Sequence, residues 1–315
     1  MPEAVPLSPA DVAAVVVTYH PDVAATGALV SALVDQVGTL LVVDNGSPEP
    51  ELTGLRGVVE NAGATLVTLG ANLGIGEAQN VGIRLARERG AGAVLLSDQD
   101  SLPAPDMVRR LLDGLARAAA EAEDGSRRRP AAVGPVTIDE RNPGAALLFS
   151  DHRWGPRRAI LPPTEGALVP ATFLIASGCL IPLAAIDAVG PMNSSWFIDH
   201  IDLEWGLRAT RAGLGLYGVV GAQLEHSLGD RTQRIPGRRR DVHIHSPLRN
   251  YYMVRNTVLL IRSGLLRSAW RWGYAGWITK YAVFYVLAVP PRLRRAGLMA
   301  RALVHGLGGR TGALR

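Results

Sequence analysis

The chain has 315 residues, 48% of them hydrophobic, and its single cysteine, Cys179, excludes a disulfide framework or a cysteine-based zinc site. The first nine residues lack the basic and apolar segments of a signal peptide, so we expect a cytoplasmic protein. The net charge of +5 combines +15 over residues 227–315 with −10 over the remainder, and no recognised nucleic-acid-binding motif accompanies the basic end, so we expect no nucleic-acid partner.

Residues 13–100 alternate apolar strands with helical segments. The strands are predicted over 13–19, 39–43, 65–69 and 93–96, and the helices between them over 22–37, 51–61 and 77–89. Strands and helices in this alternating order predict a parallel sheet with helices on both faces. A further helix is expected over 106–122.

The second half of the chain is less regular. A strand is predicted over 131–138, an irregular stretch over 139–169, an apolar stretch over 171–181, a helix over 202–212, and two short strands over 215–217 and 222–224. Two long helices follow, over 247–263 and 266–289, and Pro290-Pro291 stops the second of them.

Two carboxylates, Asp98 and Asp100, directly follow the predicted strand over 93–96. They stand at the carboxyl end of a strand, where open α/β sheets bind their ligands. Carboxylate oxygens suit Mg²⁺ or Mn²⁺, and Mg²⁺ usually binds one or two of them together with substrate phosphates. An ordinary turn is the alternative, because Asp is common in turns.

Two other motifs end neighbouring strands and are expected at the same edge of the sheet. Thr18 and Tyr19 end the first strand, and Asp44 ends the second. The Asp44 carboxylate can accept a hydrogen bond from a nucleobase imide N–H. The alternative is that it closes its own turn, as Asx residues commonly do.

The glycine-rich loop over 70–76 precedes a helix, so its amides are expected to favour phosphate oxygens. Asn72 and Gly74 lie in this loop, and Asn80 lies one turn inside the helix. The glycine spacing matches neither the P-loop nor the Rossmann pattern, and Gly-Lys-Ser/Thr is absent. The loop therefore does not indicate an ATPase.

A second acidic cluster contains Asp199 and Asp202. If a helix begins near Asp202, backbone N–H groups keep that carboxylate ionised, and it can serve as a general base; a simple N-cap is the alternative. His226 could complete a metal site with the Asp98–Asp100 pair, although a lone histidine is more often structural. Five arginines within 230–241 could close over a diphosphate or simply solvate the surface.

The C-terminal region over 247–315 is basic, apolar and rich in tryptophan. Arg271 and Lys280 interrupt its second helix, which therefore suits a membrane interface better than a membrane span. Two alternatives remain open: the helix belongs to the core, or the C-terminal helices contact a second copy in a homo-oligomer.

Taken together, these motifs resemble inverting family 2 glycosyltransferases of the GT-A fold, and among them bacterial dTDP-rhamnosyltransferases. The resemblance covers about residues 13–262. Its motifs occur in family order: Val-Val-Thr-Tyr-His (16–20), Val-Val-Asp-Asn-Gly-Ser (42–47), Asn-Leu-Gly-Ile-Gly-Glu-Ala-Gln-Asn (72–80), Ser-Asp-Gln-Asp-Ser (97–101), Phe-Ile-Asp-His-Ile-Asp-Leu-Glu-Trp-Gly-Leu-Arg-Ala (197–209), His-Ser-Leu-Gly (226–229) and Arg-Asn-Tyr-Tyr-Met-Val-Arg-Asn (249–256).

The resemblance implies a role for each matched residue. Asp44 would bind the donor base, Asp98 would lie near the ribose or metal, and Asp100 and His226 would hold the metal. Asp202 would be the catalytic base. The family's acidic pair would place an acid at position 201, where this chain has Ile201, so Asp199 remains an alternative base. Thr18, Tyr19, Asn72, Gly74, Asn80 and Arg249 are the further expected donor-binding residues.

The expected architecture is an α/β GT-A catalytic domain over 1–246, with a nucleotide-binding half over 13–122 and an acceptor half over 131–246, followed by a membrane-associating helical region over 247–315. The expected function is Mg²⁺- or Mn²⁺-dependent transfer of L-rhamnose from dTDP-L-rhamnose onto a cell-surface polysaccharide or lipid-linked glycan at the inner face of the membrane. One alternative is a galactofuranosyl- or other UDP-sugar transferase. Another, from a different class, is a non-catalytic nucleotide-sugar-binding protein.

Overall fold

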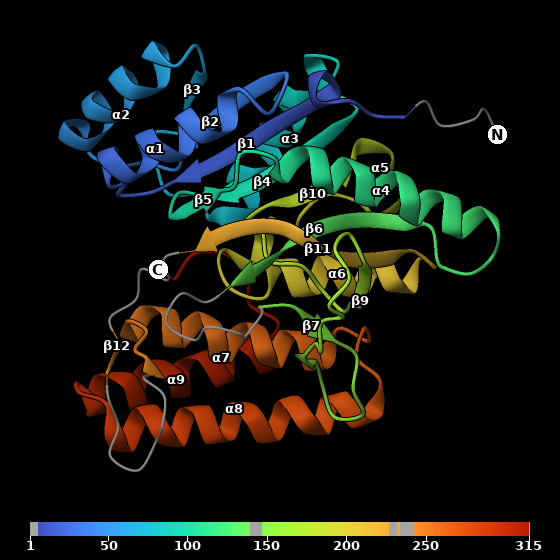
Figure 1. Ribbon diagram of the computed structural model, residues 1–315. Helices are drawn as coiled ribbons and strands as arrows, with labels where there is room; N and C mark the ends of the chain where they lie inside the picture. The colour runs from blue at the N-terminus through green and yellow to red at the C-terminus, as the bar shows by residue number, and fades with distance from the viewer. Residues whose placement is uncertain (1–5, 139–146, 227–231, 234–241, 315) are drawn as a thin grey trace.

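The computed structural model describes residues 6–138, 147–226, 232–233 and 242–314. A mixed sheet runs through its centre in the strand order β3-β2-β1-β4-β10-β6-β11-β5, and β9 pairs with β11 (Figure 1). The C-terminal helices form a separate layer below the sheet in this view. The α/β architecture predicted from the sequence is therefore confirmed, including the C-terminal helical region.

The first half of the sheet is parallel. Its strands and connecting helices are β1 (Val12–Thr18), α1 (Val23–Val34), β2 (Thr39–Asp44), α2 (Glu49–Asn61), β3 (Thr65–Thr68), α3 (Ile75–Glu88) and β4 (Ala93–Asp98). Thr18 pairs with Asp44, and Val17 pairs with Asp98. This register brings the polar ends of three strands to the same edge of the sheet, as the motif positions predicted.

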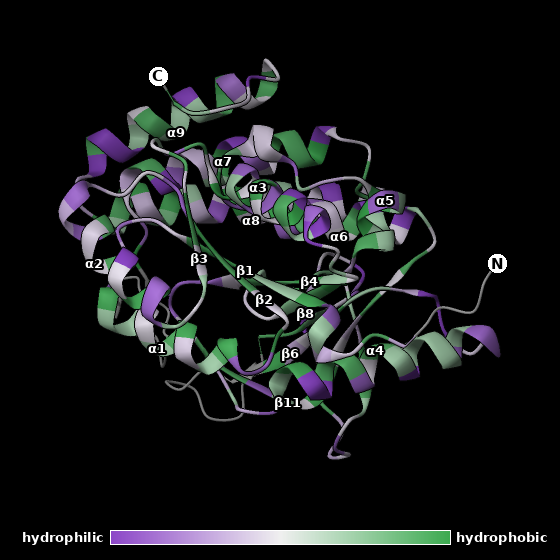
Figure 2. Cartoon of the chain, turned by 90° about the horizontal axis from the view of Figure 1, so that it is seen from above, coloured by the Kyte–Doolittle hydropathy of each residue, from purple (hydrophilic) through white to green (hydrophobic). Residues whose placement is uncertain are grey.

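Both faces of the parallel half are buried, because successive residues of β1 point to opposite sides. Val12, Ala14 and Val16 pack with α1, α2 and α4. Ala13, Val15 and Val17 pack with α3 and with the later helices α5 and α6. Figure 2 shows the apolar strands lying between these two helical layers. Burial on both faces explains why β1 and β4 are continuous apolar runs.

The second half makes the sheet mixed, since β10 runs antiparallel to both β4 and β6. Its elements are β5 (Ser101–Pro103), α4 (Met107–Glu123), β6 (Pro130–Ile138), β7 (Phe149–Ser150), β8 (Arg157–Arg158), β9 (Leu168–Ala171), β10 (Cys179–Pro182), α5 (Leu183–Val189), α6 (Ile201–Arg211) and β11 (Gly215–His226), with 3-10 turns η1 (Pro9–Asp11) and η2 (Ser194–Trp196).

Three details differ from the sequence prediction. The segments over 215–217 and 222–224 belong to one continuous strand, β11, whose irregularity lies between Val219 and Gln223. The residues after Asp100 form the short strand β5 rather than only a turn, because β11 pairs with them. The helix predicted to begin near Asp202 begins at Ile201, which moves Asp202 inside its first turn.

Three helices follow a two-stranded element, β12 (Thr232–Gln233) with β13 (Val242–His243). They are α7 (Pro247–Arg262), α8 (Ser268–Ala288) and α9 (Arg292–Leu307). Leu260, Trp270 and Tyr274 share a core with the sheet, so α7 and α8 are packed onto the sheet and its helices. Among the described residues, no helix is both long and apolar enough to cross a membrane.

Candidate active site

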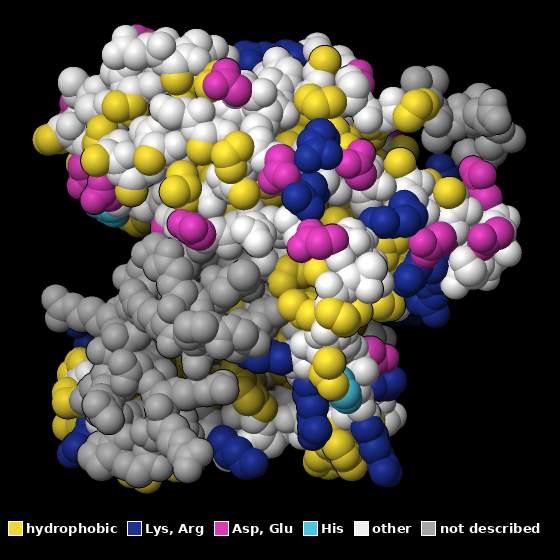
Figure 3. All heavy atoms as spheres, viewed as in Figure 1, with side chains coloured by type: hydrophobic (Ala, Val, Ile, Leu, Met, Phe, Trp, Pro, Cys, Tyr) yellow, Lys and Arg dark blue, Asp and Glu magenta, His cyan; other side chains and the backbone are white. Residues whose placement is uncertain are grey.

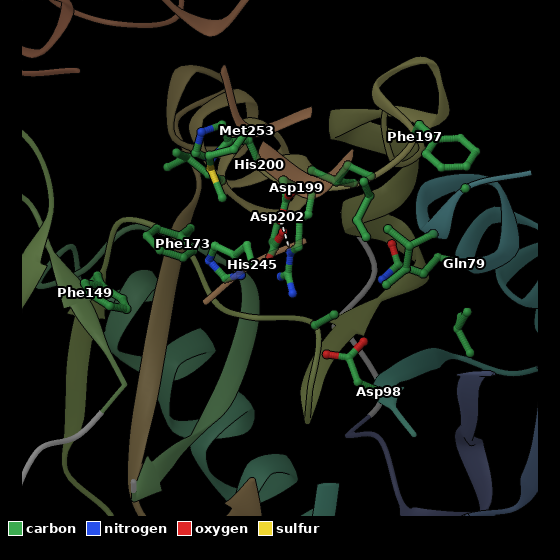
Figure 4. Close-up of a pocket in the computed structure, with 18 of the residues that line it drawn as sticks. Gln79, Asp98, Phe149, Phe173, Phe197, Asp199, His200, Asp202, His245 and Met253 are labelled. Carbon is green, nitrogen blue, oxygen red and sulfur yellow. Dashed lines mark hydrogen bonds and ion pairs between the residues drawn. The ribbon is translucent and has the colours of Figure 1, made fainter. Parts of the chain in front are cut away.

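A cavity of about 1120 Å³ opens at the carboxyl ends of β1 and β4. It is somewhat larger than the roughly 300–1,000 Å³ of typical ligand pockets. Its walls come from the sheet edge, the start of α3, the segment before α6, and the helices α7 and α8 (Figure 4). Eight residues predicted from the sequence line it: Thr18, Tyr19, Asn72, Gly74, Asp98, Asp100, Asp202 and Arg249.

Two asparagines join the loops on the sheet side of the cavity. Asn45 Nδ2 donates to Asn72 Oδ1 at 3.2 Å, and Leu73 N donates to Asn45 Oδ1 at 2.9 Å. Gly74 directly precedes α3 as its N-cap residue, with φ +90°, and a Cβ there would lie 2.6 Å from the carbonyl oxygen of Phe197. The loop after β3 can therefore approach the segment before α6 only because residue 74 is glycine.

Asp44 lies behind this wall and does not line the cavity. Its side chain is 1% exposed and closes its own turn, which was the alternative interpretation of the sequence. Oδ1 accepts from the amides of Gly46 and Ser47 at 3.1 and 2.9 Å, and Oδ2 accepts from the hydroxyls of Thr18 and Ser47 at 3.1 and 2.5 Å. Base binding by Asp44 stays a prediction, and it would require one of these hydroxyls to turn away.

Asn80 also lies outside the cavity wall. Its Oδ1 accepts from Met192 N and its Nδ2 donates to Met192 O, both at 2.9 Å. The side-chain amide thus bonds to both the N–H and the C=O of Met192, as a neighbouring strand would. This pair of hydrogen bonds fixes the segment between α5 and η2 against α3. Asn80 therefore supports one wall of the site, and its predicted contact with the donor stays untested.

The carboxylates of Asp98 and Asp100 face the cavity from the end of β4. Asp98 Oδ2 accepts a hydrogen bond from Ser177 Oγ at 2.6 Å. The backbone of His226 pairs with Ser101, directly beside Asp100, while its side chain lies outside the described structure. The arginines within 230–241 lie outside it as well.

The donor set fits a divalent cation held partly by substrate. Within the described ranges no three His, Cys, Asp or Glu side chains are grouped as a protein-only metal site. Two strand-end carboxylates facing an open cavity are what Mg²⁺ or Mn²⁺ needs when diphosphate oxygens and water complete the coordination. The described residues therefore fit the expected cation.

Asp202 faces the cavity from the first turn of α6 and also borders a small internal void that reaches Cys179. Burial raises the pKa of Asp202 to about 7; a backbone N–H and Arg249 lower it, and the charges of Asp98 and Asp199 raise it. The expectation that helix N–H groups keep Asp202 fully ionised is therefore wrong. Desolvation outweighs the helix N-terminus because the carboxylate is partly buried between the cavity and the internal void.

Asp199 lies one turn earlier and has a different environment. Its Oδ1 accepts from Arg249 Nε at 3.1 Å, and its side chain is only 6% exposed. Figure 4 shows Asp199 and Asp202 in the same part of the pocket, with Asp98 opposite. An ion-paired carboxylate is a weaker proton acceptor than an unpaired one, so this geometry favours Asp202 as the base and Asp199 as the partner that orients Arg249.

An aromatic wall lies on the side of the cavity away from β1, and we define it as Phe149, Trp154, Phe173, Tyr274 and Trp277. The rings of Phe149 and Phe173 stack with centroids 5.2 Å apart. Trp154 and Trp277 are 50% and 42% exposed. The sequence did not indicate that Phe149, Phe173, Tyr274 and Trp277 line the site. Trp196 is buried in the core and does not line the cavity.

Other lining residues were also missed. Gln79 borders both the cavity and the void beside Asp202, and its buried Oε1 has no hydrogen-bond partner among the described residues. His200 lines the cavity, and burial lowers its pKa, with Asp199 opposing that shift. Thr257 Oγ1 donates its hydrogen to Met253 O at 2.7 Å, so it must accept a hydrogen bond from His200 Nε2 at 2.8 Å. The hydrogen of the neutral imidazole is therefore assigned to Nε2. Both residues lie within the motif segments, which was the available signal.

Comparison with known proteins points in the same direction. The family described as Glycosyl transferase family 2 matches residues 14–161. The chain is 32% identical over 250 residues to the dTDP-rhamnosyl transferase RfbF of Shigella flexneri, covering 79% of each protein.

Solved structures with low sequence identity share the fold. GalNAc-T7 with UDP, GalNAc and Mn²⁺ matches with TM-score 0.55 and 14% identity, over 89% of this chain and 58% of that one. Thus the chain spans little more than half of GalNAc-T7. Residues 1–349 of Staphylococcus aureus TarS with UDP-GlcNAc match with TM-score 0.56 and 13% identity, over 94% and 81%. The Pyrobaculum calidifontis mannosyltransferase PcManGT with GDP-Man and Mn²⁺ matches with TM-score 0.50 and 16% identity, over 93% and 75%.

Proposed function

The chain belongs to glycosyltransferase family 2, and from this premise we propose that it transfers L-rhamnose from dTDP-L-rhamnose, with inversion, to a hydroxyl of a cell-surface polysaccharide or lipid-linked glycan. The observation that carries the reaction type is the partly buried carboxylate of Asp202, with its pKa of about 7, in the same cavity as Asp98 and Asp100. The donor is supported by the similarity to the dTDP-rhamnosyl transferase RfbF of Shigella flexneri.

In this reaction Asp202 accepts the proton of the acceptor hydroxyl. The hydroxyl oxygen forms a bond to the anomeric carbon, while the bond from that carbon to the diphosphate breaks on the opposite face and its electron pair leaves with the nucleotide. A single displacement without a protein nucleophile inverts the anomeric configuration. A base with a pKa near the working pH is well matched to this proton transfer.

Asp98, Asp100 and His226 would hold the Mg²⁺ or Mn²⁺ ion, whose charge would offset that of the departing diphosphate. Two structural neighbours, GalNAc-T7 and PcManGT, contain Mn²⁺ together with a nucleotide or a nucleotide sugar. The carboxylates would also fix the diphosphate at the end of β4, across the cavity from the base.

The donor would lie along the sheet side of the cavity. Thr18, Tyr19, Asn72 and Gly74 would surround the nucleotide, because they line the cavity around the ends of β1 and β3. Arg249 would contact the diphosphate, since it lines the cavity while its Nε is held by Asp199. A guanidinium oriented by a buried carboxylate is well suited to phosphate oxygens. Asp44 and Asn80 would support this wall from behind.

The acceptor would lie along the aromatic wall. Sugar rings present apolar faces that pack against indole and phenol rings, and Trp154 and Trp277 offer exposed rings beside the cavity. In Figure 4 Asp202 lies between Phe173 of this wall and Asp98 at the end of β4. The hydroxyl of a sugar ring that is stacked on this wall would lie in the part of the cavity that Asp202 faces.

The enzyme would bind the inner face of the membrane peripherally. Residues 242–315 contain twelve Lys and Arg and no acid. Exposed apolar side chains accompany them, including Trp272 and Leu287 on α8 and Leu293 and Val304 on α9. In Figure 3 the lower part of the visible face shows dark-blue basic side chains and few magenta acidic ones. Such a composition suits anionic headgroups, and it would bring the cavity near a lipid-linked acceptor.

A donor survey tests the proposed function. The protein is incubated with Mn²⁺ and either dTDP-L-rhamnose or UDP-sugars, including UDP-galactofuranose, and thermal stabilisation and donor hydrolysis or transfer are measured. We expect dTDP-L-rhamnose to stabilise and react best. Preferential reaction with a UDP-sugar would replace the donor assignment, and binding without turnover of any donor, with glycan acceptors supplied, would favour a non-catalytic protein.

A further inference from the structure

The segment before α6 has an unusual backbone. Phe197, Asp199 and His200 have φ values of +69°, +66° and +63°, although none of them is glycine. Three left-handed residues among four consecutive positions cost conformational free energy, and such a turn persists only where its surroundings hold it. We call residues 196–200 the strained turn. It leads directly into Asp202 and also carries Asp199, the partner of Arg249.

The side-chain amide of Asn256 on α7 is the main contact that holds the strained turn. Its Nδ2 lies 3.0 Å from Trp196 O, 2.7 Å from Ile198 O and 3.1 Å from Asp199 O. The side chain is fully buried. One NH₂ group therefore gathers three carbonyls of the strained turn around a single point, which fixes the path of the backbone between them.

Arg255 supports the same contact from behind. Its Nε donates to Asn256 Oδ1 at 2.9 Å, which aims the amide NH₂ at the turn, and its Nη2 donates to Trp196 O at 2.8 Å. The guanidinium also packs over the ring of Tyr252, 4.9 Å from its centroid. The Arg255 side chain is 1% exposed, yet all its hydrogen bonds in the described structure go to uncharged oxygens. Burying a guanidinium cation without a carboxylate partner costs free energy of folding. Arg255 is therefore expected to have a role besides packing.

The C-terminal segment completes the support. Arg255 Nη1 donates to Gly312 O at 2.5 Å, and Gly312 N donates to Ser195 O at 2.6 Å. Residue 312 thus bridges Arg255 and the residue just before the strained turn. The end of the chain returns to within hydrogen-bond distance of the segment that leads to Asp202.

We propose that Asn256 and Arg255 are positioning residues for the transfer reaction, which hold the strained turn so that Asp202 and Asp199 keep their places in the cavity. This inference rests on the proposed function, because it assumes that Asp202 is the base. Neither side chain lines the cavity, so neither touches the substrate. Their effect on the reaction is therefore exerted through the backbone of residues 196–200.

The test compares Asn256→Ala and Arg255→Lys with Arg262→Lys. Arg262 lies on the same helix, and its Nη1 donates to the carbonyls of Gly306 and Leu307, so it supports the end of α9 without contacting the strained turn. Lysine cannot reproduce the planar fork of arginine at either position. The readouts are kcat with saturating substrates, the calorimetric Kd of the nucleotide diphosphate with Mn²⁺, and the melting temperature.

For Asn256→Ala and Arg255→Lys we expect kcat to fall roughly 100-fold, the scale for misplacing a catalytic group by about 1 Å. The Kd should rise by a smaller factor, about three- to tenfold, because the turn also carries Asp199, the partner of Arg249. Arg262→Lys should keep kcat within about threefold. The proposal is overturned if both test variants keep kcat, if the Kd rises as much as kcat falls, or if Arg262→Lys loses as much activity. If Asn256→Ala does not fold, Arg255→Lys decides. An active Asp202→Asn would instead refute the proposed base, independently of these variants.

Discussion

At the scale of single residues, Asp202 and Asp199 have opposite environments although they lie three positions apart. Asp199 is paired with Arg249, whereas Asp202 is enclosed and its pKa is raised to about 7. The family resemblance implied Asp202 as the base and left Asp199 as an alternative. It could not predict the raised pKa, because enclosure depends on α7 and β10, which are distant in sequence.

The pKa of Asp202 predicts a pH dependence. A general base must be deprotonated, so kcat/KM should rise with pH through about 7 and level off above it. A bound cation near Asp98 would move this limb to lower pH by favouring the ionised form. Asp202→Asn should lower kcat by roughly 10²–10⁴-fold and abolish the limb. Initial rates from pH 5.5 to 9 measure this.

Asp199→Asn serves as the comparison for this experiment. Because Asp199 pairs with Arg249, its loss should weaken donor binding more than it lowers kcat. If Asp199→Asn alone reproduced the loss of the pH limb while Asp202→Asn remained active, the two roles would have to be exchanged.

The carboxylate pair after β4 predicts a dependence on metal. Asp100→Ala should remove most of the Mn²⁺-dependent part of dTDP binding and abolish turnover. The reason is that the protein supplies few ligands to the cation, so losing one of them strongly weakens its binding. Calorimetry with and without Mn²⁺ measures the binding. Asp113→Ala, an exposed carboxylate on α4, is the control and should change neither. Unchanged Mn²⁺-dependent affinity in Asp100→Ala would refute its assignment as a metal ligand.

At the scale of elements, the parallel half of the sheet follows closely from the sequence, because its strands are continuous apolar runs. The prediction missed elements that form only because they pair with segments distant in sequence, or that are too short to show a pattern. β5 exists because β11 lies beside it, and α5 is too short to show helical periodicity. α9 was missed because Pro290-Pro291 was interpreted only as a stop, although proline is also compatible with the first turn of a new helix.

The elements that complete the cavity lie late in the chain, since α8 contributes Tyr274 and Trp277 to the aromatic wall. Trp277→Ala should raise the acceptor KM about tenfold, corresponding to the roughly 1–2 kcal/mol of a ring contact, while donor Kd stays unchanged. Trp272→Ala is the matched control, because this residue lies on the same helix, is 75% exposed and does not line the cavity. Kinetics with a soluble acceptor separate the two. Equal acceptor KM values in Trp277→Ala and the unmodified enzyme would exclude this ring from the acceptor site.

At the scale of the whole molecule, the basic C-terminal region is also part of the catalytic cavity. Arg249 and Met253 of α7 and three residues of α8 line it, so removal of residues 247–315 would destroy the site as well as any membrane contact. The division of the chain at residue 246 stays a prediction from composition. Surface substitutions are therefore the appropriate test of membrane binding.

We expect the protein to sediment with vesicles that contain anionic lipid and to be released by salt. Replacing Lys280, Arg292 and Arg294 by glutamine should lower vesicle affinity roughly 100-fold, at about 1 kcal/mol per basic residue. The control replaces Arg56, Arg84 and Arg109, which are exposed on α2, α3 and α4. Equal losses in both triple variants, or indifference of the unmodified protein to anionic lipid, would contradict the assignment. A dimer in light scattering without vesicle binding would favour a second copy as the partner.

We propose that this chain transfers a sugar by a single displacement with Asp202 as the base. The decisive measurement is the anomeric configuration of the product, determined by NMR after transfer from dTDP-L-rhamnose. We expect a product whose anomeric configuration is opposite to that of the donor. A product with the donor's configuration retained would require a second displacement and would contradict the mechanism.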